Sequence, residues 1–163
     1  MDVFEAIRKR RSIRNYTGDS IPVEHLEQIV DAGRWAASGY NRQPWTFVVV
    51  TDKAMLERFC VVSKAVEQAA AVIAVVMDDS SQFWLEDASA AVENMLLAST
   101  ALGYGSCWLE GRTLAHEQEL KEWLGVPAEK RLITLVSLGV PVEWPAKEKK
   151  PLSEVLRWEM YSE

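Results

Sequence analysis

Ala71-Val72-Ile73-Ala74-Val75-Val76-Met77 is a continuous apolar run rich in β-branched side chains. A short run of this kind, without alternating polar residues, is typical of a strand buried on both faces of a sheet. The polar stretch that follows, Asp78-Asp79-Ser80-Ser81, predicts a loop. We therefore expect the fold to be built around a central strand over residues 71 to 77.

The rest of the chain alternates between helical and strand patterns around this run. Apolar residues at helical spacing predict helices over residues 2 to 10, 22 to 38, 53 to 70, 83 to 102 and 116 to 124. Short apolar segments predict further strands over residues 46 to 50, 104 to 109 and 132 to 139. A short amphipathic turn between residues 152 and 158 closes the chain, and its apolar side chains need a surface to cover them.

Length and composition indicate one ordinary globular domain over residues 1–163. Hydrophobic residues make up 48% of the chain and charged residues 26%, which argues against disorder. No apolar run is long enough to span a membrane and no signal peptide is evident, so we expect a cytoplasmic protein with no membrane contact. Two cysteines and two histidines are too few for a disulfide framework or a structural zinc site, so no metal is expected.

A basic cluster near the N-terminus opposes the charge of the whole chain. Arg8-Lys9-Arg10-Arg11-Ser12-Ile13-Arg14 holds five of the eighteen Lys and Arg residues, although the net charge is −6. An acidic surface would repel a long polyanion such as nucleic acid, whereas a small phosphate group suits arginines beside a serine hydroxyl. A solvated helix end or a localisation signal would explain this stretch alone equally well.

A second basic cluster lies near the C-terminus, in Lys147-Glu148-Lys149-Lys150-Pro151. The two clusters could converge on one phosphate, although a lysine-rich tail taken alone is usually just solvated.

Two stretches between these clusters could meet a ligand. Ala37-Ser38-Gly39-Tyr40-Asn41-Arg42-Gln43-Pro44-Trp45 is a polar loop that could read the edge of a heterocycle, although a simple helix-to-strand connector fits its composition better. Gly103-Tyr104-Gly105-Ser106-Cys107-Trp108-Leu109-Glu110-Gly111 has glycines on both sides of a short strand, where backbone groups could meet a ligand. Cys107 lies among apolar residues and is expected to be buried and unreactive.

Four motifs, taken in order, together resemble the nitroreductase family of flavin enzymes. They are the N-terminal cluster, the polar loop, the stretch over residues 102–111 and the closing basic motif. Asp87 and Asn94 on the long helix also match. The resemblance spans about residues 3 to 158 and implies an α+β fold, with a central mixed, largely antiparallel sheet flanked by helices. It also implies a homodimer in which the C-terminal tail packs on the partner subunit.

The resemblance further implies an FMN site. Arg10, Arg11, Ser12, Lys147 and Lys149 would hold the FMN phosphate, and Arg14 would reach the ribityl chain or the pyrimidine end of the flavin. The segment from Ala37 through Ser38 and Gly39 to Asn41 would contact the flavin of the partner subunit. Trp108, Leu109, Glu110 and Gly111 would lie along the flavin ring. Family members commonly have proline where this chain has Ala37, and the insertions that cover the flavin in larger members are missing near residues 58 to 71.

The implied activity is an FMN-dependent oxidoreductase that passes hydride from NAD(P)H to nitroaromatic, quinone or similar acceptors by a ping-pong mechanism. The cofactor carries the chemistry, so no catalytic side chain is expected. The alternatives are a non-catalytic flavin-binding sensor or carrier, and an enzyme of the same fold with divergent chemistry, such as dehalogenation or flavin breakdown.

Overall fold

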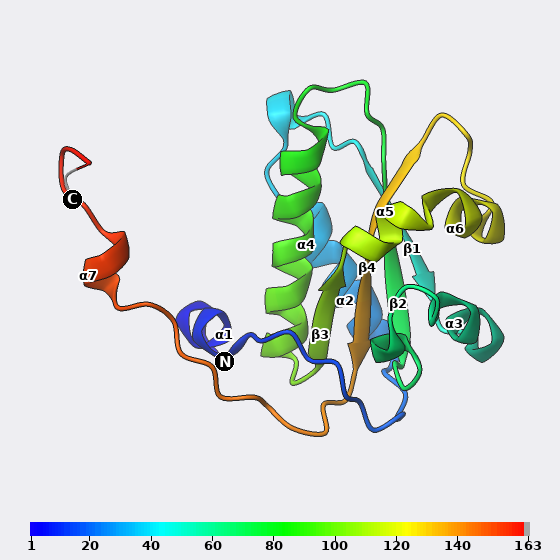
Figure 1. The fold of residues 1–163 in the computed structure, drawn as a ribbon, viewed down its shortest axis with the longest axis horizontal. Coiled ribbons are helices and arrows are strands. Elements are labelled where there is room, and N and C mark those ends of the chain that lie inside the picture. Colours follow the sequence, from blue (N-terminus) through cyan, green and yellow to red (C-terminus); the bar gives the residue numbers. More distant parts are fainter. Residues whose placement is uncertain (162–163) are drawn as a thin grey trace.

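Strand β2 (Ala71–Met77) lies inside a four-stranded sheet with the order β1-β2-β4-β3, in a computed structural model that describes residues 1–161 (Figure 1). Its neighbours are β1 (Trp45–Val50) and β4 (Arg131–Gly139), and β3 (Gly105–Leu109) forms the far edge. All three strand pairings are antiparallel. Within residues 1–161 the sheet gains a parallel element only through the isolated bridge between Ser12 and Ser106.

Seven α-helices surround this sheet in the described part of the chain. They are α1 (Val3–Lys9), α2 (Val23–Arg34), α3 (Lys53–Phe59), α4 (Trp84–Ala101), α5 (Gly111–Ala115), α6 (Glu117–Leu124) and α7 (Leu152–Val155). Two short 3-10 turns lie at Gly39–Asn41 and Lys64–Val66. The α+β architecture implied by the family resemblance is confirmed. In the described residues no helix combines the length and apolar character needed to cross a bilayer.

The alternation of side chains along β2 divides the core into two layers. Ile73 and Val75 point to the face covered by α2 and α4, where Met95 completes the packing. Val72 and Ala74 point to the opposite face, where the core includes residues of α3 and α6. All seven residues of β2 are buried, as its continuous apolar run predicts.

The segment from 53 to 70 was expected to be one helix, and this expectation is wrong. Helix α3 ends at Phe59, and a separate 3-10 turn begins at Lys64. The Ser63 hydroxyl accepts a hydrogen bond from the Ala65 amide, which caps the new turn instead of continuing the helix. The short helix α5 was not predicted, because its five residues are too few to show an apolar period.

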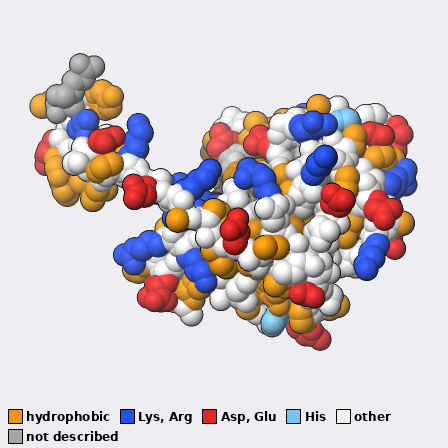
Figure 2. Space-filling view, turned by 60° about the horizontal axis from the view of Figure 1, so that its bottom comes forward, with side chains coloured by type: hydrophobic (Ala, Val, Ile, Leu, Met, Phe, Trp, Pro, Cys, Tyr) orange, Lys and Arg blue, Asp and Glu red, His pale blue; other side chains and the backbone are white. Residues whose placement is uncertain are grey.

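The C-terminal residues form an arm that extends away from the body of the chain, next to α1 (Figure 1). The side chains of Leu152, Val155 and Trp158 on this arm are 69%, 63% and 76% exposed. Figure 2 shows these apolar groups standing clear of the body, with Lys and Arg side chains gathered where the arm meets it. On α1, Val3, Phe4 and Ile7 are also exposed, so this chain leaves apolar surface uncovered.

Candidate functional site

The N-terminal basic cluster is held in place by the end of the sheet. After α1, the chain runs beside β3, and the Ile13 amide donates a hydrogen bond to the Ser106 carbonyl at 2.9 Å. The Ile13 side chain packs so closely on Gly105 that a Cβ atom there would lie 2.8 Å from it. The glycine in β3 therefore lets the basic segment approach the sheet.

Tyr16 is the second anchor of this segment. Its hydroxyl lies 2.8 Å from the Ile13 carbonyl oxygen and 2.9 Å from Ser137 Oγ, in β4. Its ring covers Gly139, where an added Cβ would lie 2.6 Å from the ring. Burial is the main cause that raises the pKa of this phenol far above its usual value. Tyr16 is thus held neutral and fixes the backbone on both sides of Arg14.

The C-terminal segment returns to the same place. The Val142 amide donates to the Asn15 carbonyl at 3.1 Å, which extends the contact between the two ends. The Trp144 ring packs on the small cluster around Ile13 and lies under the Lys9 ammonium, 4.7 Å from the ring centroid. The two basic clusters, more than 130 residues apart in sequence, are therefore brought together.

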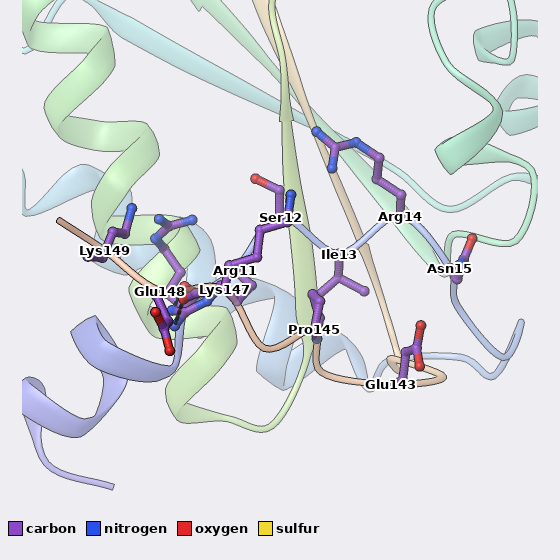
Figure 3. A pocket seen from close by; sticks show the side chains of 11 residues that line it. Arg11, Ser12, Ile13, Arg14, Asn15, Glu143, Pro145, Lys147, Glu148 and Lys149 are labelled. Atoms are coloured by element: carbon purple, nitrogen blue, oxygen red, sulfur yellow. Dashed lines mark hydrogen bonds between the residues drawn. The ribbon is translucent and has the colours of Figure 1, made fainter.

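A cavity of about 430 Å³ lies between these two segments (Figure 3). Its volume falls in the range of small-molecule sites. Five basic side chains and two carboxylates line it, which gives the lining a formal charge of +3. The lining residues are Arg10, Arg11, Ser12, Ile13, Arg14, Asn15, Glu143, Pro145, Lys147, Glu148 and Lys149.

Several polar groups of the lining are free to bind a ligand. In residues 1–161, no protein group pairs with the Ser12 hydroxyl, the Arg14 guanidinium or the ammonium groups of Lys147 and Lys149. The Arg10 Nε lies 3.2 Å from a carboxylate oxygen of Glu93 in α4, which leaves the two terminal nitrogens of Arg10 available. The cavity thus offers an anion several unused donors.

Arg11 differs from its neighbours. Its guanidinium donates to the carbonyl oxygens of Arg8 and Arg10, both at 2.7 Å, and to that of Lys147 at 2.9 Å. It lines the cavity, but most of its hydrogen-bonding capacity is directed at the backbone.

The polar loop at residues 37 to 41 lies outside this cavity, at the N-terminal end of α4 (Figure 1). The Gly39 amide donates to the buried carboxylate of Asp87 at 2.9 Å, and the close packing of Phe83 leaves no room for a Cβ on Gly39. Tyr40 and Asn41 adopt φ angles of 53° and 56°, in the left-handed region that L-residues rarely occupy. The loop therefore presents strained, exposed polar residues to its surroundings.

The strand end at residues 108 to 111 also lies outside the cavity lining. Trp108 and Leu109 are half-buried at the end of β3, while Glu110 and Gly111 are exposed at the start of α5. The indole nitrogen of Trp108 is buried and has no partner in the described residues. Of the fourteen predicted site residues, six line the cavity and eight lie elsewhere in this chain.

No side chain near the cavity is set up as a nucleophile. Cys107 is 1% exposed, and burial raises the pKa of its thiol, with Arg14 opposing the shift weakly. In the described residues no group of histidine, cysteine and carboxylate side chains could hold a metal ion. The sequence did not point to Glu93, the partner of Arg10, because helical spacing shows only that it lies on an exposed face of α4.

Comparison with known proteins identifies relatives of this chain. The sequence pattern of the Nitroreductase family matches residues 7–74 and 60–140. A protein of Methanothermobacter thermautotrophicus, provisionally named NADH dehydrogenase/NAD(P)H nitroreductase, is 35% identical over 89% of this chain and 80% of its own length. A protein of Archaeoglobus fulgidus with the same provisional name is 38% identical over 86% of both chains.

Solved structures support the same relationship. A provisionally named nitroreductase from Desulfovibrio desulfuricans, determined in complex with FMN, superposes with a TM-score of 0.86. It is 31% identical in sequence, and the match covers 99% of each chain. Because the family pattern spans most of the sequence and two relatives exceed 30% identity over most of their length, this chain belongs to the nitroreductase family.

Proposed function

We propose that this chain binds FMN with its phosphate in the basic cavity and acts as an NAD(P)H-dependent oxidoreductase. The observation that carries the proposal is the convergence of two distant basic clusters around one cavity, in a chain whose net charge is −6. A lining charge of +3 with free donors matches a phosphate monoester, which carries between one and two negative charges at neutral pH.

Within the cavity, each group has a separate task. The free nitrogens of Arg10, the Ser12 hydroxyl and the ammonium groups of Lys147 and Lys149 would hold the phosphate. Figure 3 shows Arg14 on the same segment as Ser12, with Ser12 between it and Lys149 and with its side chain extending toward the strands. This position suits a contact with the ribityl chain or the pyrimidine end of the flavin.

The names of relatives support this choice of ligands. The Desulfovibrio structure contains FMN, and the names of the two archaeal relatives include NADH and NAD(P)H. The residues of this chain fit the same cofactor, since the cavity supplies cationic donors without a metal-binding set in the described residues.

The flavin ring would be enclosed by residues outside the phosphate cavity. Trp108, Leu109, Glu110 and Gly111 would line it from the same chain. The loop from Ala37 through Ser38 and Gly39 to Asn41 lies outside the cavity lining, at the N-terminal end of α4, and we assign it to the flavin site of a partner subunit. The exposed apolar residues of α1 and the C-terminal arm support a homodimer, in which the arm packs on the partner.

Bound FMN would supply the hydride chemistry in both half-reactions. The protein would bind and orient the nicotinamide donor and then the acceptor in turn at the same exposed face, which gives ping-pong kinetics. Arg14 would place positive charge near the pyrimidine ring, where negative charge gathers during reduction. No side chain of this chain is required as a general acid or base in this scheme.

Nicotinamide oxidation tests the enzymatic proposal. FMN-loaded protein should bleach at the flavin band when NADH or NADPH is added without oxygen, and a quinone or nitroaromatic acceptor should restore the band. Free FMN at the same concentration serves as the control. Protein that holds FMN but is bleached by neither nicotinamide would contradict the activity and indicate a flavin carrier.

A further inference from the structure

Arg11 connects the two ends of the chain that form the cavity. Two of its hydrogen bonds go to the carbonyl oxygens of Arg8 and Arg10, at the C-terminal end of α1. The third goes to the carbonyl oxygen of Lys147, 136 residues away. A cation at a helix C-terminus is favourable because the unpaired carbonyl groups there carry partial negative charge.

Little of the Arg11 side chain remains for a ligand. A guanidinium has five N–H donors, and three of them are used on these carbonyl oxygens. The Nε atom is buried and unpartnered in the described residues, so it does not face the open cavity. Arg10, in contrast, uses only Nε, in its contact with Glu93, and keeps both terminal nitrogens free.

We propose that Arg11 is a positioning residue: it clamps the segment around Lys147 to the end of α1 and thereby places Lys147 and Lys149 in the cavity. The adjacent arginines then have different roles, with Arg10 on the phosphate and Arg11 on the backbone. The effect on ligand binding rests on the proposed FMN function, whereas the clamp itself does not.

The clamp explains how an otherwise loosely held segment can form half of a site. Between Val142 and the start of α7 the segment has no regular secondary structure. In the described residues, the other attachment of this segment beyond Val142 is the contact of Trp144 with Lys9 and the nearby apolar cluster. Arg11 therefore supplies the attachment closest to the two lysines that face the cavity.

Proteolysis without flavin tests the clamp directly. Endoproteinase Glu-C should cleave after Glu148 about tenfold faster in the Arg11→Ala variant, because cleavage needs the segment to leave its place and the charged hydrogen bond that holds the Lys147 carbonyl is lost. Arg11→Lys should be cleaved as fast as Arg11→Ala, since an ammonium group cannot reproduce the fixed, planar set of donors of the guanidinium. Arg10→Ala should cleave at the wild-type rate. Equal cleavage of wild type and Arg11→Ala would overturn the clamp.

Affinity measurements test the consequence of the Arg11 clamp for FMN binding. Arg11→Ala and Lys147→Ala should each raise the Kd of FMN about tenfold. The double variant should be no weaker than about the weaker single variant, because Arg11→Ala already takes the Lys147 ammonium away from the phosphate. The effects of Arg10→Ala and Lys147→Ala on the Kd of FMN should instead multiply in the double variant. Riboflavin affinity, which involves no phosphate, should be unchanged in Arg11→Ala, whereas a general loss of structure would weaken both ligands.

The outcomes separate the two proposals. Multiplicative losses for Arg11→Ala and Lys147→Ala, or full FMN affinity in Arg11→Lys, would show that Arg11 acts on the phosphate by its charge and would overturn the positioning role. Wild-type protein that binds no FMN would overturn the proposed function and the effect of Arg11 on ligand binding. The cleavage rates at Glu148 would still decide whether Arg11 clamps the segment.

Discussion

Adjacent residues of the same type have different surroundings in the N-terminal basic cluster. Arg10 contacts a carboxylate and keeps two nitrogens free, whereas Arg11 is bonded to three backbone carbonyl oxygens. The sequence shows that both are cationic and close to Ser12, which fits an anion site and a solvated helix end equally well until the family motifs are added. It cannot show which arginine faces the anion, because this depends on the position of a segment more than 130 residues away.

The free nitrogens of Arg10 predict a strong effect on FMN binding. Arg10→Ala should weaken FMN binding by about 1.5–3 kcal/mol, the scale of a hydrogen bond to a charged group. Lys53→Ala removes the same charge from an exposed position at the start of α3 and should leave the affinity unchanged. Fluorescence titration of the apo-protein measures both. Equal losses in the two variants would indicate a nonspecific charge effect.

Tyr16 predicts a pH dependence of stability. The pKa of its phenol is raised above the value of about 10 expected in the unfolded chain, mainly by burial. Its contribution is therefore complete below pH 10 and is lost as the pH rises above 10, because the unfolded state releases the proton first. Tyr16→Phe should lose about 1–3 kcal/mol at pH 8, where it leaves buried hydrogen-bonding partners unpaired.

Above pH 10 the difference between Tyr16→Phe and wild type should shrink, since only the wild type loses stability by this route. Urea unfolding at pH 8 and at pH 11 measures it. A gap that is constant across this range would contradict the role assigned to the phenol.

At the scale of the elements, close contacts at two glycines position the site. Gly105 and Gly139 lie at the ends of β3 and β4 that pair with each other, and each is covered by a residue of the basic segment. The basic segment is thus packed onto the sheet. In the described residues it forms no strand of the sheet and joins it through an isolated bridge between Ser12 and Ser106.

Gly139 provides a test of this packing. Gly139→Ala should lower the free energy of unfolding by about 1–3 kcal/mol, because its Cβ would lie 2.6 Å from the Tyr16 ring. Gly111→Ala is the matched control, since no atom lies within 4 Å of the Cβ position there. Thermal unfolding of the apo-proteins compares them. If both variants unfold at the same temperature as the wild type, the basic segment is not held by this contact.

Much of the element structure could be predicted from the sequence, for identifiable reasons. The continuous apolar run of β2 and the helical spacing of apolar residues in α4 are both clear sequence signals, and both elements lie where expected. At residues 60 to 70 the Ser63 hydroxyl caps a new turn instead of continuing the helix, and the five residues of α5 are too few to show an apolar period. The site itself required the motifs of the family, since no local pattern shows that the two ends of the chain meet.

At the scale of the whole molecule, one chain leaves apolar surface uncovered and part of the proposed flavin site incomplete. The arm carries exposed Leu152, Val155 and Trp158, and the strained loop around Asn41 lies away from the cavity of its own chain. A homodimer would cover the apolar side chains of the arm and bring the loop around Asn41 to the flavin of the partner subunit. The dimer and the cofactor site are therefore expected to depend on each other.

Two truncations separate these contributions. Removal of 151–163 takes away α7 and should weaken the dimer while leaving the cavity residues in the chain. Removal of 144–163 also takes away Lys147 and Lys149, so FMN affinity should fall further. Light scattering with size-exclusion chromatography gives the mass, and titration gives the affinity. A chain without 144–163 that remains dimeric and holds FMN like the wild type would contradict both assignments.

The central claim is that the basic cavity holds the phosphate of a flavin. Titration of the apo-protein with FMN and with riboflavin tests it most directly, because the two ligands differ only in the phosphate. We expect one FMN per chain and at least about 100-fold weaker binding of riboflavin, because two or more charge-assisted hydrogen bonds to the phosphate are lost. Equal affinity for both ligands, or no binding of FMN, would contradict it.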